Sequence, residues 1–163
     1  MQTEGAPCID SRAAFAAALL WGFAQACEGG ARRIVCVDPD FAAWPLDDAA
    51  LLERLTAWLQ RPQRRLVLLA AGYDNVARCQ PRFVAWRRHW AHAVAAWQAP
   101  EDLCPTLPTL LLDDDALLVW LVERMHWRGR ALLDARESRP HRDEIDAVLQ
   151  RSTPAFAITT LGL

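Results

Sequence analysis

Polar residues that could bind a ligand follow two apolar runs of the sequence. Two aspartates come directly after the run 33–37, and three further polar residues follow the run 65–71. If these runs are parallel neighbouring strands, their carboxyl ends meet at one edge of a sheet, where open α/β sheets usually place ligands. The same residue types also serve ordinary turns. The sequence predicts a candidate ligand-binding crevice made by Asp38, Asp40, Tyr73, Asp74 and Asn75.

Arginine offers a second kind of chemistry. All 18 basic residues of the chain are arginine, so lysine-based chemistry such as a Schiff base or a Walker-type phosphate lysine is excluded. Three arginines lie among the tryptophans of segment 81–98, and two more lie in the aromatic and basic cluster 126–130. Such groups could bind phosphate or stack on bases, although a solvated helix face and a plain turn compete with this interpretation. The anion-binding candidates are Arg82, Arg87, Arg88, Arg128 and Arg130.

Other chemistries have less support, and we expect no catalytic residue, metal site or cofactor. Asp113, Asp114 and Asp115 are three consecutive acids, but successive side chains at a strand end point apart, so a solvated turn is favoured over a cation site. His89 and His92 lack a third ligand at helical spacing. The five cysteines form no CxxC pair, which favours reduced thiols and a cytoplasmic protein.

The segment 32–72 defines the expected fold. An apolar run over 33–37, a helical pattern over 46–60 and a second apolar run over 65–71 make a βαβ unit with parallel strands. Both runs are apolar at consecutive positions, as expected for strands covered by helices on both faces. We therefore predict an α/β fold, a mixed sheet with a parallel βαβ core flanked by helices. At 163 residues the chain should form a single domain, 1–163.

The remaining elements follow from the same patterns. We expect a helix over 13–27, a loop over 72–75 and a long helix over 81–98, with Phe83, Trp86, Trp90, Val94 and Trp97 in one apolar stripe. Strands are expected over 109–112, 116–122 and 129–134, in an antiparallel or mixed half of the sheet. A short helix over 142–151 and an apolar segment over 154–163 end the chain.

The order of these elements resembles half of a phospholipase D-type domain, of the degenerate kind found in bacteria. The resemblance rests on segments 33–40, 44–46, 64–69, 81–88 and 109–113 and covers roughly residues 30–135. The resemblance implies a phospholipase D-like core in 31–135, to which the sequence pattern adds an N-terminal helix in 1–30 and a C-terminal helix and apolar tail in 136–163.

The catalytic signature of that family, His-x-Lys-x-x-x-x-Asp, is absent. Taking Asp113 as its aspartate places Thr106 and Pro108 at the His and Lys positions, and taking Asp114 places Leu107 and Thr109 there. The resemblance thus implies an inactive site, and a homodimer, because active single-repeat members pair across a two-fold axis.

Our expectation from the sequence is a non-catalytic binding or assembly domain that works as a homodimer. The alternative is a hydrolase or phosphate-ligand-binding protein that uses the crevice at Asp38, Tyr73 and Asp74. Nucleic-acid binding through the arginine-rich helix is less favoured, since the net charge is −2. Another protein partner is compatible with the pattern, and no membrane partner is expected, because no uncharged run approaches the ~20 residues of a membrane span.

Overall fold

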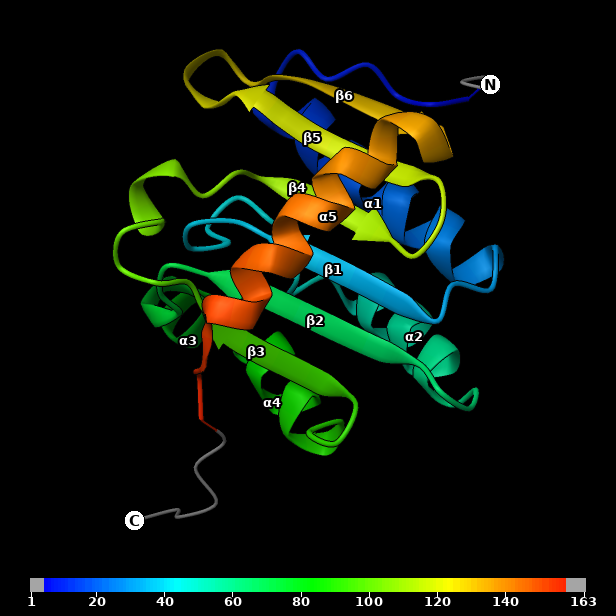
Figure 1. Cartoon of the computed structure of the whole chain (residues 1–163). Coiled ribbons are helices and arrows are strands. Elements are labelled where there is room, and N and C mark those ends of the chain that lie inside the picture. The colour runs from blue at the N-terminus through cyan, green and yellow to red at the C-terminus, as the bar shows by residue number, and fades with distance from the viewer. Residues whose placement is uncertain (1–4, 158–163) are drawn as a thin grey trace.

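The computed structural model of the chain describes residues 5–157 (Figure 1). Helices and strands alternate in its first part, and a meander of three strands and a long helix follow. The elements are α1 (Arg12–Glu28), β1 (Arg33–Val37), α2 (Ala49–Leu59), β2 (Arg65–Ala70), α3 (Asp74–Cys79), α4 (Pro81–His89), β3 (Val94–Gln98), the 3-10 turn η1 (Cys104–Thr106), β4 (Leu110–Asp113), β5 (Leu117–Glu123), the 3-10 turn η2 (Arg124–His126), β6 (Arg128–Leu133), α5 (Ala135–Arg151) and β7 (Thr153–Pro154).

Within residues 5–157, seven strands form one mixed sheet in the order β6-β5-β4-β1-β2-β3-β7. β1 pairs with β2, and β2 with β3, in parallel register, whereas β4, β5 and β6 pair antiparallel on the other side of β1. The predicted α/β fold, with its parallel βαβ core and antiparallel second half, is therefore confirmed. After β1, the chain adds β2 and β3 on one side of it and later adds β4, β5 and β6 on the other side. A topological switch point therefore lies between β1 and β4.

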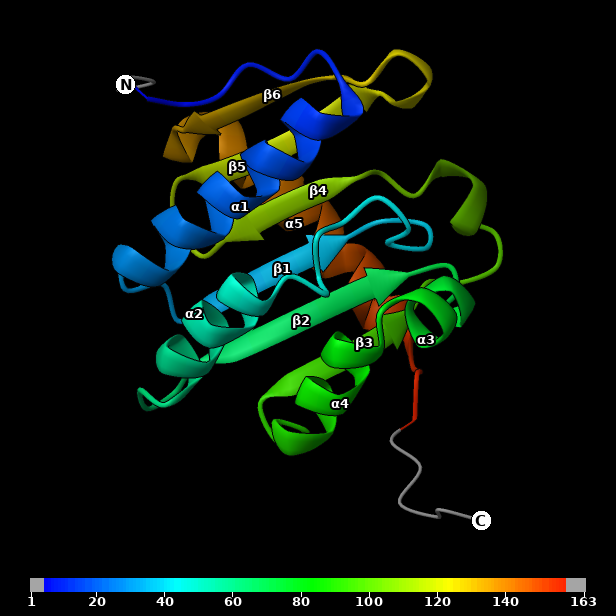
Figure 2. The ribbon, with the colours of Figure 1, turned by 180° about the vertical axis from the view of Figure 1, so that it is seen from behind.

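Helices cover both faces of the sheet. Figure 2 shows α1, α2 and α4 across one face, and Figure 1 shows α5 running diagonally across the other. Alternate residues of each central strand enter different clusters, with Ile34 and Cys36 under the three helices and Val35 and Val37 under α5. Burial on both faces explains why β1 and β2 are apolar at consecutive positions.

Side-chain caps fix where three of the helices begin. Ser11 accepts a hydrogen bond from the backbone of Ala14, and Asp48 does the same for Leu51. Asp134 accepts from the first turn of α5. Such caps satisfy amide groups that the helix itself leaves unpaired, and each contributes about 1 kcal/mol. The expected helix over 13–27 agrees with the observed α1.

The predicted long helix over 81–98 is wrong. α4 ends at His89, a turn follows, and Val94 begins β3, which pairs in parallel with β2. The tryptophan stripe is therefore divided between two elements, with Trp86 on the helix and Trp97 on the strand. The open edge of β2 gains five paired residues from β3, and this pairing outweighs the helical spacing of the apolar residues.

Two smaller expectations also need correction, and a third lies mostly outside the described residues. The expected loop over 72–75 contains the start of the short helix α3 at Asp74. α5 begins at Ala135 rather than near residue 142, although Pro140 lies within it. Its start is stabilised by buried Ser138, whose hydroxyl donates to the carbonyl of Ala116 across the fold. Of the predicted apolar end 154–163, residues 158–163 lie outside the described residues.

Among the described residues 5–157, no helix combines the length and the apolar character that crossing a membrane requires.

Candidate functional site

The five crevice candidates lie at the predicted edge of the sheet but do not line one pocket. Asp40 and Asn75 come together, since the Asn75 amide donates to the Asp40 carboxylate over 2.8 Å. Tyr73 is buried, with its hydroxyl donating to the carbonyl of Trp97 over 2.7 Å, and burial raises its pKa. Asp74 faces solvent on the first turn of α3. The side chain of Asp38 instead bonds to β4, on the other side of β1.

Asp38 organises the loop that follows β1. Its Oδ2 accepts hydrogen bonds from the backbone amides of Asp40 and Phe41, at 3.0 and 2.7 Å. Its Oδ1 accepts from the Thr109 hydroxyl at 2.6 Å. Asp38 is only 9% exposed, and a buried carboxylate is tolerated only where donors replace its lost water. These three donors make Asp38 primarily a structural acceptor.

Thr109 connects Asp38 to a second charged residue, Arg124. The Arg124 Nε donates to Thr109 Oγ1 over 3.0 Å, and its Nη2 donates to the carbonyl of Leu107. Asp38, Thr109 and Arg124 thus form a continuous chain of hydrogen bonds from β1 across β4 to the end of β5. Arg124 is held in position by two of its nitrogens, whereas its Nη1 bonds to no residue within 5–157.

A pocket of about 370 Å³ opens beside this chain, at the switch point between β1 and β4. Its volume falls within the range of small-molecule sites, and its position is the one expected for an open α/β sheet. A wider hollow of about 560 Å³ lies against α2, away from the carboxyl ends of the strands. The switch-point pocket is lined by Arg12, Phe15, Asp38, Pro39, Asp40, Ala42, Ala43, Leu121, Arg124 and Trp127.

The walls of the switch-point pocket are both apolar and charged. Phe15 packs against Trp127 with ring centroids 5.9 Å apart, and the guanidinium of Arg12 lies 5.7 Å from the Trp127 ring. Arg12 is the first residue of α1, whose N-terminal end carries a partial positive charge. The two arginines and two aspartates cancel in formal charge, but both aspartates accept hydrogen bonds from the protein, whereas Arg12 donates none within the described residues.

Two residues at the pocket have left-handed backbone conformations. Phe41, with φ of 58°, follows the Asp38 turn, and Trp127, with φ of 53°, separates η2 from β6. Residues other than glycine rarely adopt such angles, which cost about 1–3 kcal/mol and persist only where surrounding contacts impose them. For Phe41 these contacts are the Asp38 carboxylate on its amide and the Gln80 side chain on its carbonyl. The protein's own hydrogen bonds therefore fix the backbone of the pocket wall, without any need for a ligand.

The five anion-binding candidates lie in separate regions. Arg82 and Arg88 are exposed on α4, near β3, whereas Arg128 and Arg130 belong to β6 at the opposite side of the sheet. Arg130 forms an ion pair with Glu137 at 2.9 Å. Arg87 is buried and donates to the carbonyl of Phe156. No shared basic patch results from these positions.

The acidic turn between β4 and β5 has a structural role. Asp113 Oδ1 accepts from the amides of Asp115 and Leu117, at 2.8 and 3.0 Å, and Asp114 accepts from the amide of Arg32. Burial raises the pKa of Asp113. Across residues 5–157, no group of three His, Cys, Asp or Glu side chains lies close enough together to hold a metal ion.

Sequence reasoning missed the residues that give the switch-point pocket its character: Arg12, Thr109, Arg124 and Trp127. The aromatic and basic cluster 126–130 was the available signal, but it pointed to Arg128 and Arg130. The position of Thr109 at the start of a predicted strand was a possible signal. Its partner Asp38 lies 71 residues away in the sequence, so their contact leaves no local pattern. Comparison with protein families, with curated proteins and with solved structures finds no match for this chain.

Proposed function

We propose that the chain is a non-catalytic binding domain that takes a small organic anion into the switch-point pocket. The observation that carries the proposal is the pair of arginines, Arg12 and Arg124, with hydrogen-bond donors left over, on the wall of a preset pocket. Guanidinium groups with spare donors favour carboxylate and phosphate ligands. The apolar lining from Phe15, Leu121 and Trp127 favours a ligand whose anionic group is joined to a flat apolar body.

The chemistry of the lining residues supports binding rather than catalysis. Within residues 5–157, the pocket lining has no serine, cysteine, histidine or lysine, and its two carboxylates, Asp38 and Asp40, both accept hydrogen bonds from the protein. The hydroxyl of Thr109 donates to Asp38, which lines the pocket, but Thr109 is 1% exposed and also accepts a hydrogen bond from Arg124. A nucleophile must reach its substrate to attack it, so this hydroxyl is poorly placed for covalent catalysis.

The test is thermal denaturation in the presence of phenyl phosphate, phenol and inorganic phosphate. We expect phenyl phosphate to raise the Tm most, because it supplies both the charge and the flat ring. At a hundred times its Kd, a ligand stabilises by about 2.7 kcal/mol, or roughly 5–10 °C for a chain of this size.

Two variants locate the effect. Arg12→Gln should lose most of the ligand-induced rise in Tm. Without ligand, the Tm of this variant should stay close to that of the parent, since Arg12 is exposed. The matched control is Arg82→Gln, on exposed α4, which should respond to phenyl phosphate as the parent does. The proposal is wrong if no anionic ligand raises the Tm, or if Arg12→Gln responds fully.

We also propose that the chain works as a homodimer, as its resemblance to degenerate phospholipase D-like domains implies. That relationship rests on the sequence pattern, and the missing signature supports an inactive site. Within residues 5–157, the large hydrophobic side chains exposed to solvent are Val122 and Met125. Most apolar side chains are thus buried within the domain. A homodimer would have to form through particular residue contacts, because the described residues present no broad apolar surface. Light scattering after size exclusion tests this, and a monomer at micromolar concentration would refute it.

A further inference from the structure

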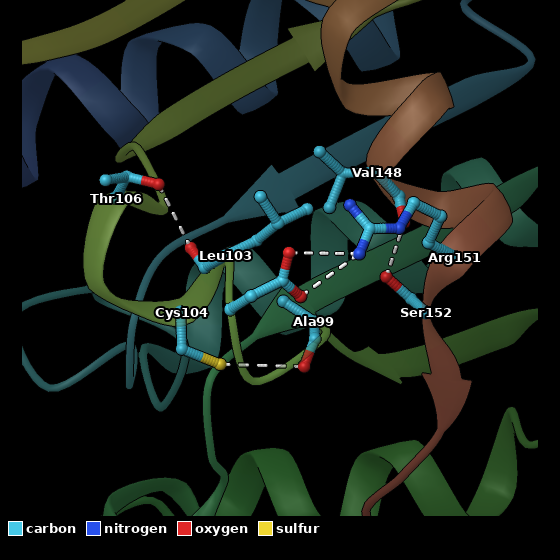
Figure 3. Close-up of polar contacts among 8 residues, drawn as sticks. Ala99, Leu103, Cys104, Thr106, Val148, Arg151 and Ser152 are labelled. Carbon is cyan, nitrogen blue, oxygen red and sulfur yellow. Dashed lines mark hydrogen bonds and ion pairs between the residues drawn. The ribbon is translucent and has the colours of Figure 1, made fainter.

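The C-terminal segment leaves the domain from a fixed point at the end of α5. Arg151 Nη2 contacts both carboxylate oxygens of Asp102, at 3.0 and 3.1 Å, and ties the helix to the connector between β3 and β4 (Figure 3). The hydroxyl of Ser152 donates to the carbonyl of Val148 over 2.7 Å and closes the last turn. Ser152 itself has extended backbone angles, so the helix stops there and the chain continues as a strand.

Residues 153–157 cover the outer edge of β3 with few backbone contacts. Thr153 and Pro154 form β7, which pairs antiparallel with Gln98 and Trp97. The amide of Ala155 adds one more hydrogen bond, to the carbonyl of Ala96 at 3.0 Å. A strand this short, with a proline that cannot donate, gives little stability by its backbone alone.

Phe156 supplies the specific contact of this segment. Its ring stacks on Tyr73 with centroids 5.1 Å apart and planes within 4°. The guanidinium of Arg87 also lies 4.5 Å from the ring centroid, and Arg87 donates to the Phe156 carbonyl. Tyr73 and Arg87, which we call the aromatic clamp, thus hold both the side chain and the backbone of one residue.

The aromatic clamp is built into the domain. Tyr73 and Arg87 are 7% and 6% exposed, and the Tyr73 hydroxyl is fixed by the Trp97 carbonyl. The buried Arg87 forms no ion pair within residues 5–157, and its Nε has no hydrogen-bond partner there. Burial lowers the pKa of Arg87. A buried cation without a carboxylate partner is costly, so the contact with Phe156 accounts for much of its compensation.

Holding Phe156 also strains the segment. Phe156 has a left-handed backbone with φ of 51°, which costs an aromatic residue about 1–3 kcal/mol. Residues 153–157 leave through an extended residue, pair over two residues and carry one strained anchor, so they can detach without disturbing the sheet. The exposed edge of β3 and the empty clamp would then accept the same segment from a second copy, because the contacts are identical within and between chains.

We propose that the aromatic clamp and the edge of β3 bind the C-terminal segment of a second copy, so that two chains exchange residues 153–157 and form a symmetric dimer. The inference rests on the homodimer proposed above and adds the surface and the segment that build it. It is independent of the switch-point pocket, since neither Tyr73 nor Arg87 lines that pocket.

The experiment uses two full-length variants, Phe156→Ala and Arg87→Met, each run alone and then mixed after unfolding and refolding together. Methionine keeps much of the packing of the arginine stem while removing its charge and donors. Circular dichroism and thermal denaturation must first show that both variants fold. In size exclusion with light scattering, the parent should have twice the chain mass of 18.3 kDa. Because each substitution weakens the same contact in the closed monomer and in the exchanged dimer, the dimer Kd of each variant alone should change by less than about threefold.

The mixture distinguishes exchange from other dimers. A mixed dimer pairs the intact clamp of Phe156→Ala with the intact segment of Arg87→Met, a complete contact that neither variant can form within its own chain. We therefore expect the mixture to have a dimer Kd at least about tenfold lower than that of either variant alone. That gain supports exchange. A mixture whose dimer Kd matches that of the separate variants refutes exchange and leaves the homodimer standing. A monomeric parent refutes both, and Met125→Ser controls for a dimer built on the exposed apolar residues.

Discussion

The switch-point pocket and the aromatic clamp lie at the same edge of the sheet and use the same pair of residue types. Each places an arginine over an aromatic ring, Arg12 over Trp127 and Arg87 over Phe156. In the pocket the arginine is exposed and has donors to spare, whereas in the clamp it is buried and bonded to the chain itself. The comparison teaches that the surroundings of an arginine–aromatic pair, rather than the pair itself, decide whether it can receive a ligand.

The two regions also differ in how they are kept in shape. The pocket wall is fixed by Asp38, whose carboxylate satisfies two backbone amides and the Thr109 hydroxyl. In the clamp, the Tyr73 hydroxyl is fixed by its hydrogen bond to the carbonyl of Trp97 on β3. Residues 153–157 then cover the clamp. Removal of each central residue should therefore have different consequences.

The largest effect is expected for Asp38→Ala. The change leaves two amides and the buried Thr109 hydroxyl without their acceptor, so we expect the free energy of unfolding to fall by about 3 kcal/mol. Urea denaturation measures it. Asp38→Asn keeps one acceptor oxygen and should lose clearly less. A loss below about 1 kcal/mol in the alanine variant would mean that the loop after β1 is held by other contacts.

Phe156→Ala should come next, with a loss of about 2 kcal/mol. A fully buried phenylalanine costs about 3–5 kcal/mol when truncated, but Phe156 is only partly buried. Urea denaturation at one fixed protein concentration measures the loss. Thr153→Ala, which alters the same segment without touching the clamp, should stay within about 0.5 kcal/mol of the parent. Equal losses in the two variants would show that the segment is held by its strand rather than by its aromatic anchor.

Arg12→Gln should change the free energy of unfolding by no more than about 0.5 kcal/mol, since an exposed cation over an aromatic ring contributes little. The comparison predicts that this exposed arginine serves ligand binding instead of stability. A fall in thermal stability like that of Asp38→Ala would place Arg12 among the structural residues and contradict this distinction.

The smallest effect is expected at Asp113, which lies at the other end of β4 from both regions. Burial raises the pKa of Asp113 in the folded state, so folding favours its protonated form, and its stabilising contribution falls as pH rises through that pKa. Asp113→Asn can keep an oxygen facing the amides of Asp115 and Leu117 and carries no charge. It should therefore match or slightly exceed the parent in stability at pH 7 and lose that advantage near pH 3, as thermal denaturation at the two values would show.

The βαβ unit and the antiparallel strands could be predicted because burial leaves a strong pattern in the sequence. Residues 34–37 and 66–70 are apolar at consecutive positions because α5 covers one face of the sheet and three helices cover the other (Figures 1 and 2). Segment 81–98 could not be predicted in this way. Its apolar residues follow a helical spacing by coincidence, and two alanines weaken the strand signal of β3. Only the pairing with β2, which lies 28 residues earlier in sequence, makes it a strand.

The candidate site was predictable only in part, for a related reason. Asp38 and Asp40 follow β1 directly, so their position at the sheet edge comes from the local pattern. Arg12 and Arg124 reach the pocket from the start of α1 and the end of β5, and nothing near them in the sequence marks them. Tyr73 was placed at the correct edge, but the chain's own Phe156 fills the space that a ligand was expected to occupy.

The most direct test of the central claim is a calorimetric titration of phenyl phosphate into the parent and into Arg12→Gln. If the switch-point pocket binds organic anions, the parent should bind one molecule per chain, and the variant should bind at least tenfold more weakly, a loss of about 1.4 kcal/mol. Equal affinity in the two proteins, or no measurable heat with the parent at millimolar ligand, would contradict the account.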